Sequence, residues 1–284
     1  MENEKSVQSN GQGSAGGGTS DRADKILVHY ETDRGIAVLT MDDPPANTYT
    51  YEMMRQLDES ILRTRMDDSV HVIVLRGAGE KFFSAGANIA MLASVTPTFK
   101  YYFCLHANET LNRLEHTPKL VIAALNGHTV GGGLEIAMAA DIRIAKKDAG
   151  KIGLPEVALG VLPGTGGTQR LTRIVGKTRA IDLMVSGRTF TFEEAMDWGL
   201  VNDVYPPTDF WESVMDYARQ FCPPNKAAKA VGRIKRSVQS GCDLPFESAL
   251  ALERELQQQL FQSADAKEGL SAYVEKRTAR FQGA

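Results

Sequence analysis

The chain contains 284 residues, of which 43% are hydrophobic, and carries a formal net charge of −3. This length suits one large domain or two small ones, and the composition supplies enough apolar side chains for a substantial core. The charge balance gives no electrostatic reason to expect nucleic-acid binding, and no apolar run approaches the roughly 18 residues of a membrane span. The three cysteines, Cys104, Cys222 and Cys242, lack CxxC spacing, so we expect reduced thiols in a cytoplasmic protein and neither a disulfide framework nor a zinc site.

The first half of the chain alternates between predicted strands and helices. Residues 1–22 are rich in Gly, Ser, Asn and Gln, a composition typical of a disordered tail. After this tail, apolar runs and helical periodicity predict strands over 26–30 and 35–41, a helix over 51–65, a strand over 70–76, a helix over 99–115, a strand over 120–125, a short helix over 134–140 and a strand over 141–145. Such alternation with continuous apolar strands indicates parallel strands in an α/β fold.

The signals after residue 165 are nearly all helical. Thr191 and Glu194 form a capping-box pattern at the start of a helix that we expect to end near Trp198 and Gly199. A longer helix is predicted over 246–261, where leucines form a wide apolar stripe. This stripe packs either on the core or on another subunit, and the sequence leaves both arrangements open.

A glycine triplet, Gly131 to Gly133, stands at the mouth of the predicted helix over 134–140. Glycine lets a ligand approach the main chain, and exposed N–H groups before a helix favour an anion. A second run of small residues, 83–89 (FSAGANI), follows the predicted strand over 70–76. Parallel neighbouring strands end at the same edge of a sheet, so one N–H from each loop can form an oxyanion hole. The alternative is a close strand-to-helix crossing that simply requires small residues.

Two glutamates lie in apolar surroundings close to these glycines. Glu135 falls in the first turn of the predicted helix, between Leu134 and Ile136. Glu156 follows Pro155 in another apolar segment. Buried carboxylates are rare unless they are paired or functional, and two close carboxylates in a dry site allow one to act as acid and the other as base.

Several other motifs are incomplete. The run 164–169 (GTGGTQ) has Gln where the dinucleotide-binding fingerprint needs its third glycine, and Gly176-Lys177-Thr178 lacks the upstream glycine of a P-loop. No spacing of His, Asp and Glu indicates a metal site, so we expect no metal.

Together these motifs resemble the crotonase, or enoyl-CoA hydratase/isomerase, superfamily. The resemblance runs from about Lys25 to Phe281, and the segments that carry it are 45–47 (PAN), 83–91 (FSAGANIAM), 119–133 (KLVIAALNGHTVGGG), 135–143 and 154–171 (LPEVALGVLPGTGGTQRL). It implies an α/β spiral of ββα turns over residues 23–210 and a C-terminal helical trimerisation region over residues 211–284. It also implies a homotrimer or a dimer of trimers that binds acyl-CoA, with coenzyme A entering as part of the substrate and no separate cofactor.

The resemblance also implies roles for individual residues. By position, the Ala87 and Gly132 N–H groups form the oxyanion hole, and Glu135 and Glu156 are catalytic. The residues expected to bind coenzyme A are Ala46, Ala85, Ala87, Asn88, Ile89 and Ala90. Two positions depart from the family pattern, because Asn88 stands where Asp is common and Ala90 where Lys is often found. Other basic groups must then contact the nucleotide, and Lys276 and Arg277 are the candidates.

The presence of both glutamates favours reversible hydration of 2-enoyl-CoA, with Glu135 as base and Glu156 as acid. Three alternatives remain: a 3-enoyl-CoA double-bond isomerase that uses one glutamate, a hydratase for a branched, methylglutaconyl-type CoA, and an RNA-binding protein on the same fold. The branched substrate requires a basic group in the acyl pocket, whose wall we expect to include the helix over 99–115. The acidic charge balance and the two glutamates argue against RNA binding.

Overall fold

The computed structural model describes residues 25–284, so the disordered tail predicted over residues 1–22 lies outside the described residues. The strands are β1 (Val28–Asp33), β2 (Ile36–Met41), β3 (Val72–Gly77), β4 (Phe82–Ser84), β5 (Leu120–Leu125), β6 (His128–Val130), β7 (Ile142–Lys146), β8 (Ile152–Gly153) and β9 (Asp203–Tyr205). The helices are α1 (Tyr51–Met66), α2 (Ile89–Ser94), α3 (Pro97–Glu115), α4 (Gly132–Met138), the 3₁₀ helix η1 (Glu156–Leu159), α5 (Gly167–Val175), α6 (Lys177–Ser186), α7 (Phe192–Asp197), α8 (Phe210–Arg219), α9 (Ala228–Gly241), α10 (Phe246–Phe261) and α11 (Ala264–Glu275).

A six-stranded sheet forms the centre of the molecule, in the order β1-β2-β3-β5-β7-β9. The first pair is antiparallel and every later pair is parallel. The predicted parallel α/β arrangement is therefore confirmed, including the adjacency of β3 and β5. The inner strands β2, β3 and β5 are largely buried on both faces because helices cover both faces of the sheet.

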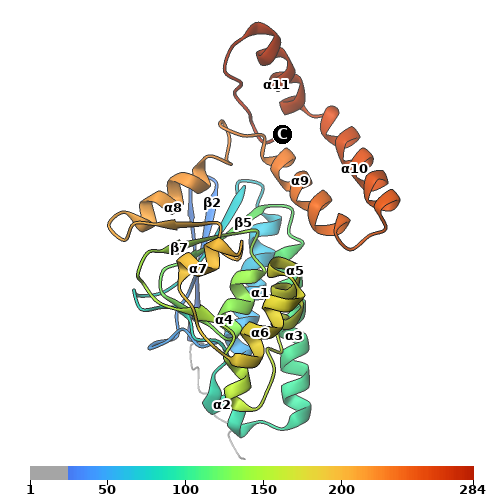
Figure 1. The fold of residues 1–284 in the computed structure, drawn as a ribbon. Helices are drawn as coiled ribbons and strands as arrows, with labels where there is room; N and C mark the ends of the chain where they lie inside the picture. The colour runs from blue at the N-terminus through green and yellow to red at the C-terminus, as the bar shows by residue number, and fades with distance from the viewer. Residues whose placement is uncertain (1–24) are drawn as a thin grey trace, which may run out of the picture.

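Alternate residues of each strand face different helical layers. Ile73 and Leu75 of β3 join a large core with α1, α3 and α4, whereas Val72 and Val74 join a smaller core with Phe210 and other residues of α8. Figure 1 shows α8 on one side of the strands and the group of α1, α3 and α4 on the other. The sheet is thus the middle layer of the body.

A second sheet, which the sequence did not predict, consists of the short parallel strands β4, β6 and β8. Each of them follows a strand of the large sheet and precedes a helix, giving the units β3–β4–α2, β5–β6–α4 and β7–β8–η1. This repeat is the ββα turn that the resemblance implies. It places the ends of β4, β6 and β8 side by side, which positions the segments that follow them.

The described helices after residue 165 agree with the prediction, with the short strand β9 as an exception. Thr191 caps α7 through a capping box with Glu194, and α7 ends at Asp197 with Trp198 as its C-cap, near the predicted end. The prediction for α4 was two residues late, because Gly131, with φ at +57°, is the N-cap and Gly132 already belongs to the helix. A positive φ suits glycine, and it turns the chain from β6 directly into α4.

The last three helices, α9 to α11, extend from the body as a helical arm (Figure 1). The apolar stripe predicted for α10 packs against α9, and Leu256 is the α10 residue that becomes buried in the chain. The stripe therefore does not pack on the large sheet, and contact with another subunit stays a prediction. Within residues 25–284, no helix is both long and apolar enough to span a membrane. The cytoplasmic location stays a prediction.

Candidate active site

The two glycine-containing segments predicted from the sequence meet at the ends of β4 and β6. Phe82 pairs with His128 and Ser84 with Thr129, so the chain leaves both strands in the same direction. A Cβ atom on Gly86 would lie 2.7 Å from the Gly132 nitrogen. The segment that contains Ala87 is therefore in contact with the first residue of α4.

The amide groups of Ala87 and Gly132 have no acceptor among the hydrogen bonds of residues 25–284. Their neighbours are engaged: the Asn88 N–H donates to the Tyr49 carbonyl at 3.0 Å, and the Gly131 N–H donates to the Gly153 carbonyl at 2.9 Å. Buried or half-buried backbone donors normally find a partner. Two neighbouring donors without one suit an oxygen atom supplied by a ligand.

Glu135 points from α4 towards the loop that precedes α5. Its Oε1 atom accepts hydrogen bonds from the Thr165 and Gly167 N–H groups, both at 2.7 Å, and its side chain is buried. Burial raises the pKa of Glu135, while these hydrogen bonds act in the opposite direction by stabilising the ionised form. Gly167 must be small, since a Cβ atom there would lie 3.0 Å from Glu135 Oε1.

Glu156 begins η1 and approaches the same place from β8. Its Oε1 atom lies 3.1 Å from the position that a Cβ atom on Gly131 would occupy, next to Gly132. Its Oε2 atom is buried and has no hydrogen-bond partner among the described residues. Burial raises the pKa of Glu156 to about 7, and the negative charge of Glu135 adds to this rise.

The structure therefore brings the four predicted site residues together. Glu135 and Glu156 interact electrostatically, and both approach the loop and helix end that carry the Ala87 and Gly132 amides. Backbone N–H groups hold the Glu135 carboxyl group, whereas Oε2 of Glu156 has no hydrogen-bond partner among the described residues. The site thus contains two carboxyl groups with different surroundings beside a pair of free amides.

The residues predicted to bind coenzyme A lie along one strip beside Ala87. The Ala85 N–H donates to the Ala46 carbonyl at 2.9 Å, which pairs the two segments. Ile89 and Ala90 are exposed at the start of α2. Asn88, which replaces the common Asp, caps α2 by accepting from the Met91 N–H at 2.9 Å and keeps the capping function without a charge.

The candidate nucleotide partners lie elsewhere in the chain. Arg277 follows α11 and forms hydrogen bonds with Glu268 and Glu275. Figure 1 shows α11 and α2 at opposite ends of the molecule. Within one chain, Lys276 and Arg277 are therefore not brought to the site.

Sequence reasoning missed two residues of this site. Tyr49 and Thr165 are buried and share a hydrogen bond of 3.0 Å between Tyr49 Oη and Thr165 Oγ1. Thr165 lies in the run 164–169, which resembles an incomplete dinucleotide-binding fingerprint and falls within the family segment 154–171, but neither pattern predicts a role for Thr165 itself. The signal that could have identified this loop is its high content of small residues and its position shortly after Glu156.

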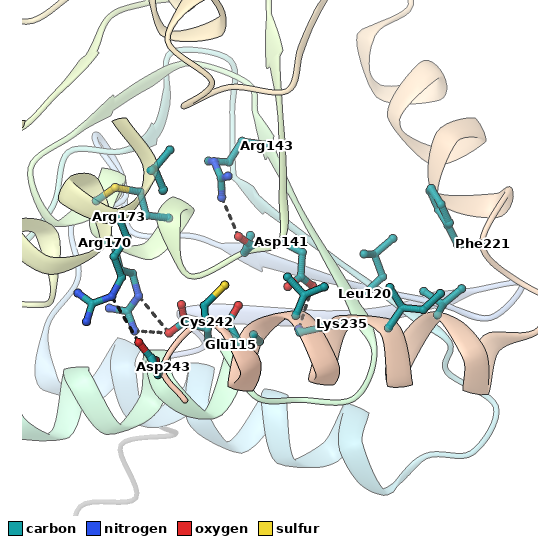
Figure 2. A pocket seen from close by; sticks show the side chains of 17 residues that line it. Glu115, Leu120, Asp141, Arg143, Arg170, Arg173, Phe221, Lys235, Cys242 and Asp243 are labelled. Atoms are coloured by element: carbon teal, nitrogen blue, oxygen red, sulfur yellow. Dashed lines mark hydrogen bonds and ion pairs between the residues drawn. The ribbon is translucent and has the colours of Figure 1, made fainter. Parts of the chain in front are cut away.

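A separate cavity of about 540 Å³ lies between α9 and the body (Figure 2). Its lining is largely apolar, with a buried ion pair of 2.8 Å between Lys235 and Asp141 and another of 2.7 Å between Arg170 and Glu115. Neither Glu135 nor Glu156 lines it. Among residues 25–284, no group of three or more His, Cys, Asp or Glu side chains is arranged to hold a metal ion.

Comparison with known proteins gives consistent matches over nearly the whole chain. Residues 31–284 match the family model described as Enoyl-CoA hydratase/isomerase. A probable enoyl-CoA hydratase of Bacillus subtilis is 38% identical over 258 residues, which cover 90% of this chain and 98% of the relative. The short-chain-enoyl-CoA hydratase of Clostridium acetobutylicum is 37% identical over 251 residues, covering 88% and 95% of the two chains. A crystal structure of an enoyl-CoA hydratase from Geobacillus kaustophilus has a TM-score of 0.89 and 45% identity, covering 92% of this chain and 98% of the other.

Proposed function

The chain belongs to the enoyl-CoA hydratase/isomerase family, and we propose that it adds water reversibly to 2-enoyl-CoA thioesters. The product is a 3-hydroxyacyl-CoA, so the enzyme is a carbon–oxygen lyase. The observation that carries this proposal is the pair of unlike carboxyl groups, Glu135 and Glu156, beside two amides without acceptors. The substrate brings coenzyme A, and the reaction as proposed uses no further cofactor.

The oxyanion hole is proposed at the Ala87 and Gly132 amides. Both N–H groups donate to the thioester oxygen, which draws electron density from the double bond and makes C3 electrophilic. The negative charge that develops on this oxygen during attack strengthens both hydrogen bonds. Catalysis follows because the amides stabilise the enolate more than the neutral thioester.

The proton transfers are assigned to the two glutamates. Glu135 accepts a proton from one water molecule as the water oxygen bonds to C3, and Glu156 gives its proton to C2. The backbone donors at Glu135 support the ionised form of this group, and the pKa of about 7 supports a protonated Glu156 near neutral pH. A proton must then pass from Glu135 to Glu156 to restore the starting state.

Coenzyme A is proposed to lie along the strip formed by Ala46, Ala85 and residues 87–90. Small side chains on this strip leave room for pantetheine next to the main chain. The missing lysine at Ala90 leaves the nucleotide without this basic partner on α2, and the missing Asp at Asn88 removes a negative charge near the pocket. Lys276 and Arg277 of a neighbouring subunit remain the proposed source.

We also propose that the chain forms a homotrimer or a dimer of trimers through the arm. The support is the number of large apolar side chains that the arm exposes, which include Phe246, Phe261, Tyr273 and Val274. Exposed apolar area of this kind is typical of an interface. Sedimentation velocity tests the proposal, and a monomer at micromolar concentration contradicts it.

The reaction itself is tested by product identification. Purified protein incubated with crotonyl-CoA is expected to give 3-hydroxybutyryl-CoA, identified by chromatography and mass. The isomerase alternative predicts instead that 3-enoyl-CoA is converted to 2-enoyl-CoA while crotonyl-CoA gains no water. A protein that leaves crotonyl-CoA unchanged contradicts the proposed hydration.

A hydratase for a substrate with a second carboxylate, such as a methylglutaconyl-type CoA, is the second candidate. It is supported by Lys100 on α3, which contacts Cys104, and Cys104 Sγ lies 3.5 Å from the position of a Cβ atom on Gly164, next to Thr165. Lys100 Nζ contacts Cys104 Sγ at 3.1 Å, and no carboxylate among residues 25–284 forms an ion pair with it. The ammonium group is thus available to a carboxylate at the end of an acyl chain.

Substrate comparison tests this second candidate. Lys100→Met is expected to raise the KM for 3-methylglutaconyl-CoA by roughly tenfold or more, because a charge-assisted hydrogen bond is lost. Crotonyl-CoA, which has no second carboxylate, serves as the control substrate. Equal changes in KM for both thioesters contradict a role in binding the distal carboxylate.

A further inference from the structure

Tyr49 lies at the centre of the site although the reaction assigns it no role. Its side chain is 2% exposed, and its hydroxyl has Thr165 Oγ1, at 3.0 Å, as its hydrogen-bond partner. Burial of a hydroxyl is costly unless a partner compensates it, and a phenylalanine would fill almost the same space without this cost. The hydroxyl group therefore requires a reason beyond packing.

The backbone of Tyr49 aligns the segment that contains Ala87. The Tyr49 N–H donates to the Gly86 carbonyl at 2.9 Å, and the Tyr49 carbonyl accepts from the Asn88 N–H at 3.0 Å. These two hydrogen bonds flank Ala87 and leave its N–H free. Tyr49 thus fixes the direction of one of the two amides that face the proposed acyl oxygen.

The ring of Tyr49 also contacts the second amide residue. A Cβ atom on Gly132 would lie 2.4 Å from Tyr49 Oη and 2.5 Å from Tyr49 Cε1. The ring packs in turn against Phe103 of α3, with 5.8 Å between the ring centroids. Tyr49 therefore touches both residues of the proposed oxyanion hole from a fixed position.

Thr165 connects Tyr49 to Glu135. Its N–H donates to Glu135 Oε1 at 2.7 Å, and its hydroxyl forms the hydrogen bond of 3.0 Å with Tyr49 Oη. The residue whose N–H holds the carboxylate is therefore itself held by the Tyr49 hydroxyl.

The Tyr49 hydroxyl keeps its hydrogen. Burial raises the pKa of Tyr49, and the negative charge of Glu135 raises it further, so the phenol stays protonated and can donate to Thr165 Oγ1. This hydrogen bond fixes the residue whose N–H holds the carboxylate that the proposed reaction uses as its base.

We propose that Tyr49 and Thr165 form a hydrogen-bond relay, from the Tyr49 hydroxyl to Thr165 and from the Thr165 N–H to Glu135, that orients the Glu135 carboxylate, while the Tyr49 backbone aligns the Ala87 amide. Tyr49 is a positioning residue in this scheme, since it touches neither the water nor the reacting carbons. The inference rests on the proposed hydration, and it adds that one residue couples the base to the oxyanion hole. Loss of the relay therefore affects the base more than the binding of the thioester.

Removal of each hydroxyl tests the relay. Tyr49→Phe and Thr165→Val each keep the shape of the side chain and remove one member of the chain. Both variants are expected to lower kcat for crotonyl-CoA hydration roughly tenfold with little change in KM. The acid limb of the pH–rate profile is expected to move up by about one pH unit, because Glu135 becomes harder to ionise.

The double variant distinguishes a relay from two separate effects. If Tyr49 acts through Thr165, the double variant loses no more activity than Thr165→Val alone. Tyr51→Phe is the matched control, because Tyr51 lies two residues away, is half exposed and packs against Phe99 and His106. This control is expected to keep the rate and pH profile of the native enzyme.

Two outcomes overturn the relay. One is a Tyr49→Phe enzyme with the native kcat and acid limb, and the other is a double variant whose loss equals the product of the single losses. Failure of the proposed function is recognised separately, as absence of hydration by the native protein. In that case ¹³C NMR titration of the Glu135 carboxyl carbon still decides, since the relay predicts a higher pKa in Tyr49→Phe and an unchanged pKa contradicts it.

Discussion

The site and the helical arm place two glutamate side chains in opposite electrostatic environments. Glu156 in the site has a buried oxygen without a partner, and burial raises its pKa to about 7. Glu268 in α11 forms a two-pronged hydrogen bond with Arg277, at 2.6 and 2.8 Å, and this contact lowers its pKa to about 2. In the arm, both oxygens of the Glu268 carboxyl group accept hydrogen bonds from Arg277. In the site, Oε2 of Glu156 accepts no hydrogen bond from the described residues.

This contrast indicates how the two regions differ in purpose. A carboxyl group with an Arg partner is fixed in one protonation state over the physiological range and cannot exchange protons there. A buried carboxyl group without such a partner titrates near neutral pH and can give or take a proton. Substitutions in the site are therefore expected to change the rate, and substitutions in the arm to change stability.

The largest effect is expected for Glu135→Gln, which keeps the shape of the side chain and removes the proposed base. Crotonyl-CoA hydration is expected to slow by roughly a hundred- to ten-thousand-fold. Glu255→Gln, at an exposed position on α10 of the arm, is the matched control, and its rate is expected to equal that of the native enzyme. Similar rates for both variants contradict the assignment of Glu135.

A substitution at Gly132 is expected to have the next largest effect. Gly132→Ala would place a methyl group 2.4 Å from Tyr49 Oη, so the ring and the neighbouring amide must move. Loss of one oxyanion donor slows catalysis by roughly a hundred- to a thousand-fold. Gly241→Ala in α9 is the control, since its Cβ atom would make an ordinary contact of 3.6 Å with Ala249. Steady-state kinetics of a folded Gly132→Ala enzyme with near-native kcat contradict the proposed oxyanion hole.

A buried ion pair connects α9 of the arm to the body of the molecule. Lys235 of α9 lies 2.8 Å from Asp141 and also donates to the Lys119 carbonyl at 3.0 Å, and only 5% of its side chain is exposed. Lys235→Met leaves the Asp141 carboxylate without its partner and is expected to lower the free energy of unfolding by about 3 kcal/mol. Urea denaturation measures this change. The exposed Lys229 on the same helix provides the control Lys229→Met, and equal stabilities of the two variants would argue against this role.

The smallest effect is expected at the Glu268–Arg277 pair, because both groups are near solvent. The folded pKa of Glu268, about 2, lies below its ordinary value of 4.5, so the pair stabilises the protein above about pH 4.5. This stabilisation is lost as the pH falls towards 2. Glu268→Gln is therefore expected to lower the melting temperature by ~2 °C or less at pH 7 and not at all near pH 2. A difference that grows as the pH falls contradicts this linkage.

The sequence predicted five of the six strands of the large sheet because these strands have strong local signals, whereas the three-residue strand β9 was missed. The run 120–125 is continuously apolar and forms β5, and the predicted strand over 70–76 is its parallel neighbour β3. The second sheet was missed because β4, β6 and β8 have only two or three residues each. Segments this short show no hydrophobic periodicity, so they are recognised as strands only by their hydrogen bonds to segments distant in the sequence.

The residues of the candidate site also differ in how strong a sequence signal they leave. Glu135, Glu156, Ala87 and Gly132 stand in motifs that chemistry and family resemblance both identify. The Tyr49–Thr165 hydrogen bond joins residues 116 positions apart and leaves no local pattern. The loop at Thr165 and Gly167 has a role that only the coordinates reveal, which is to donate two N–H groups to Glu135.

The pH dependence of crotonyl-CoA hydration tests the two-glutamate mechanism most directly. An ionised Glu135 and a protonated Glu156 predict a bell-shaped profile of kcat/KM, whose alkaline limb falls as Glu156 loses its proton near pH 7. Replacement of Glu156 by Gln is expected to remove that limb and leave only slow turnover. A native profile that is flat from pH 5 to 9, or an alkaline limb that persists in Glu156→Gln, would show that this carboxyl group does not supply the proton.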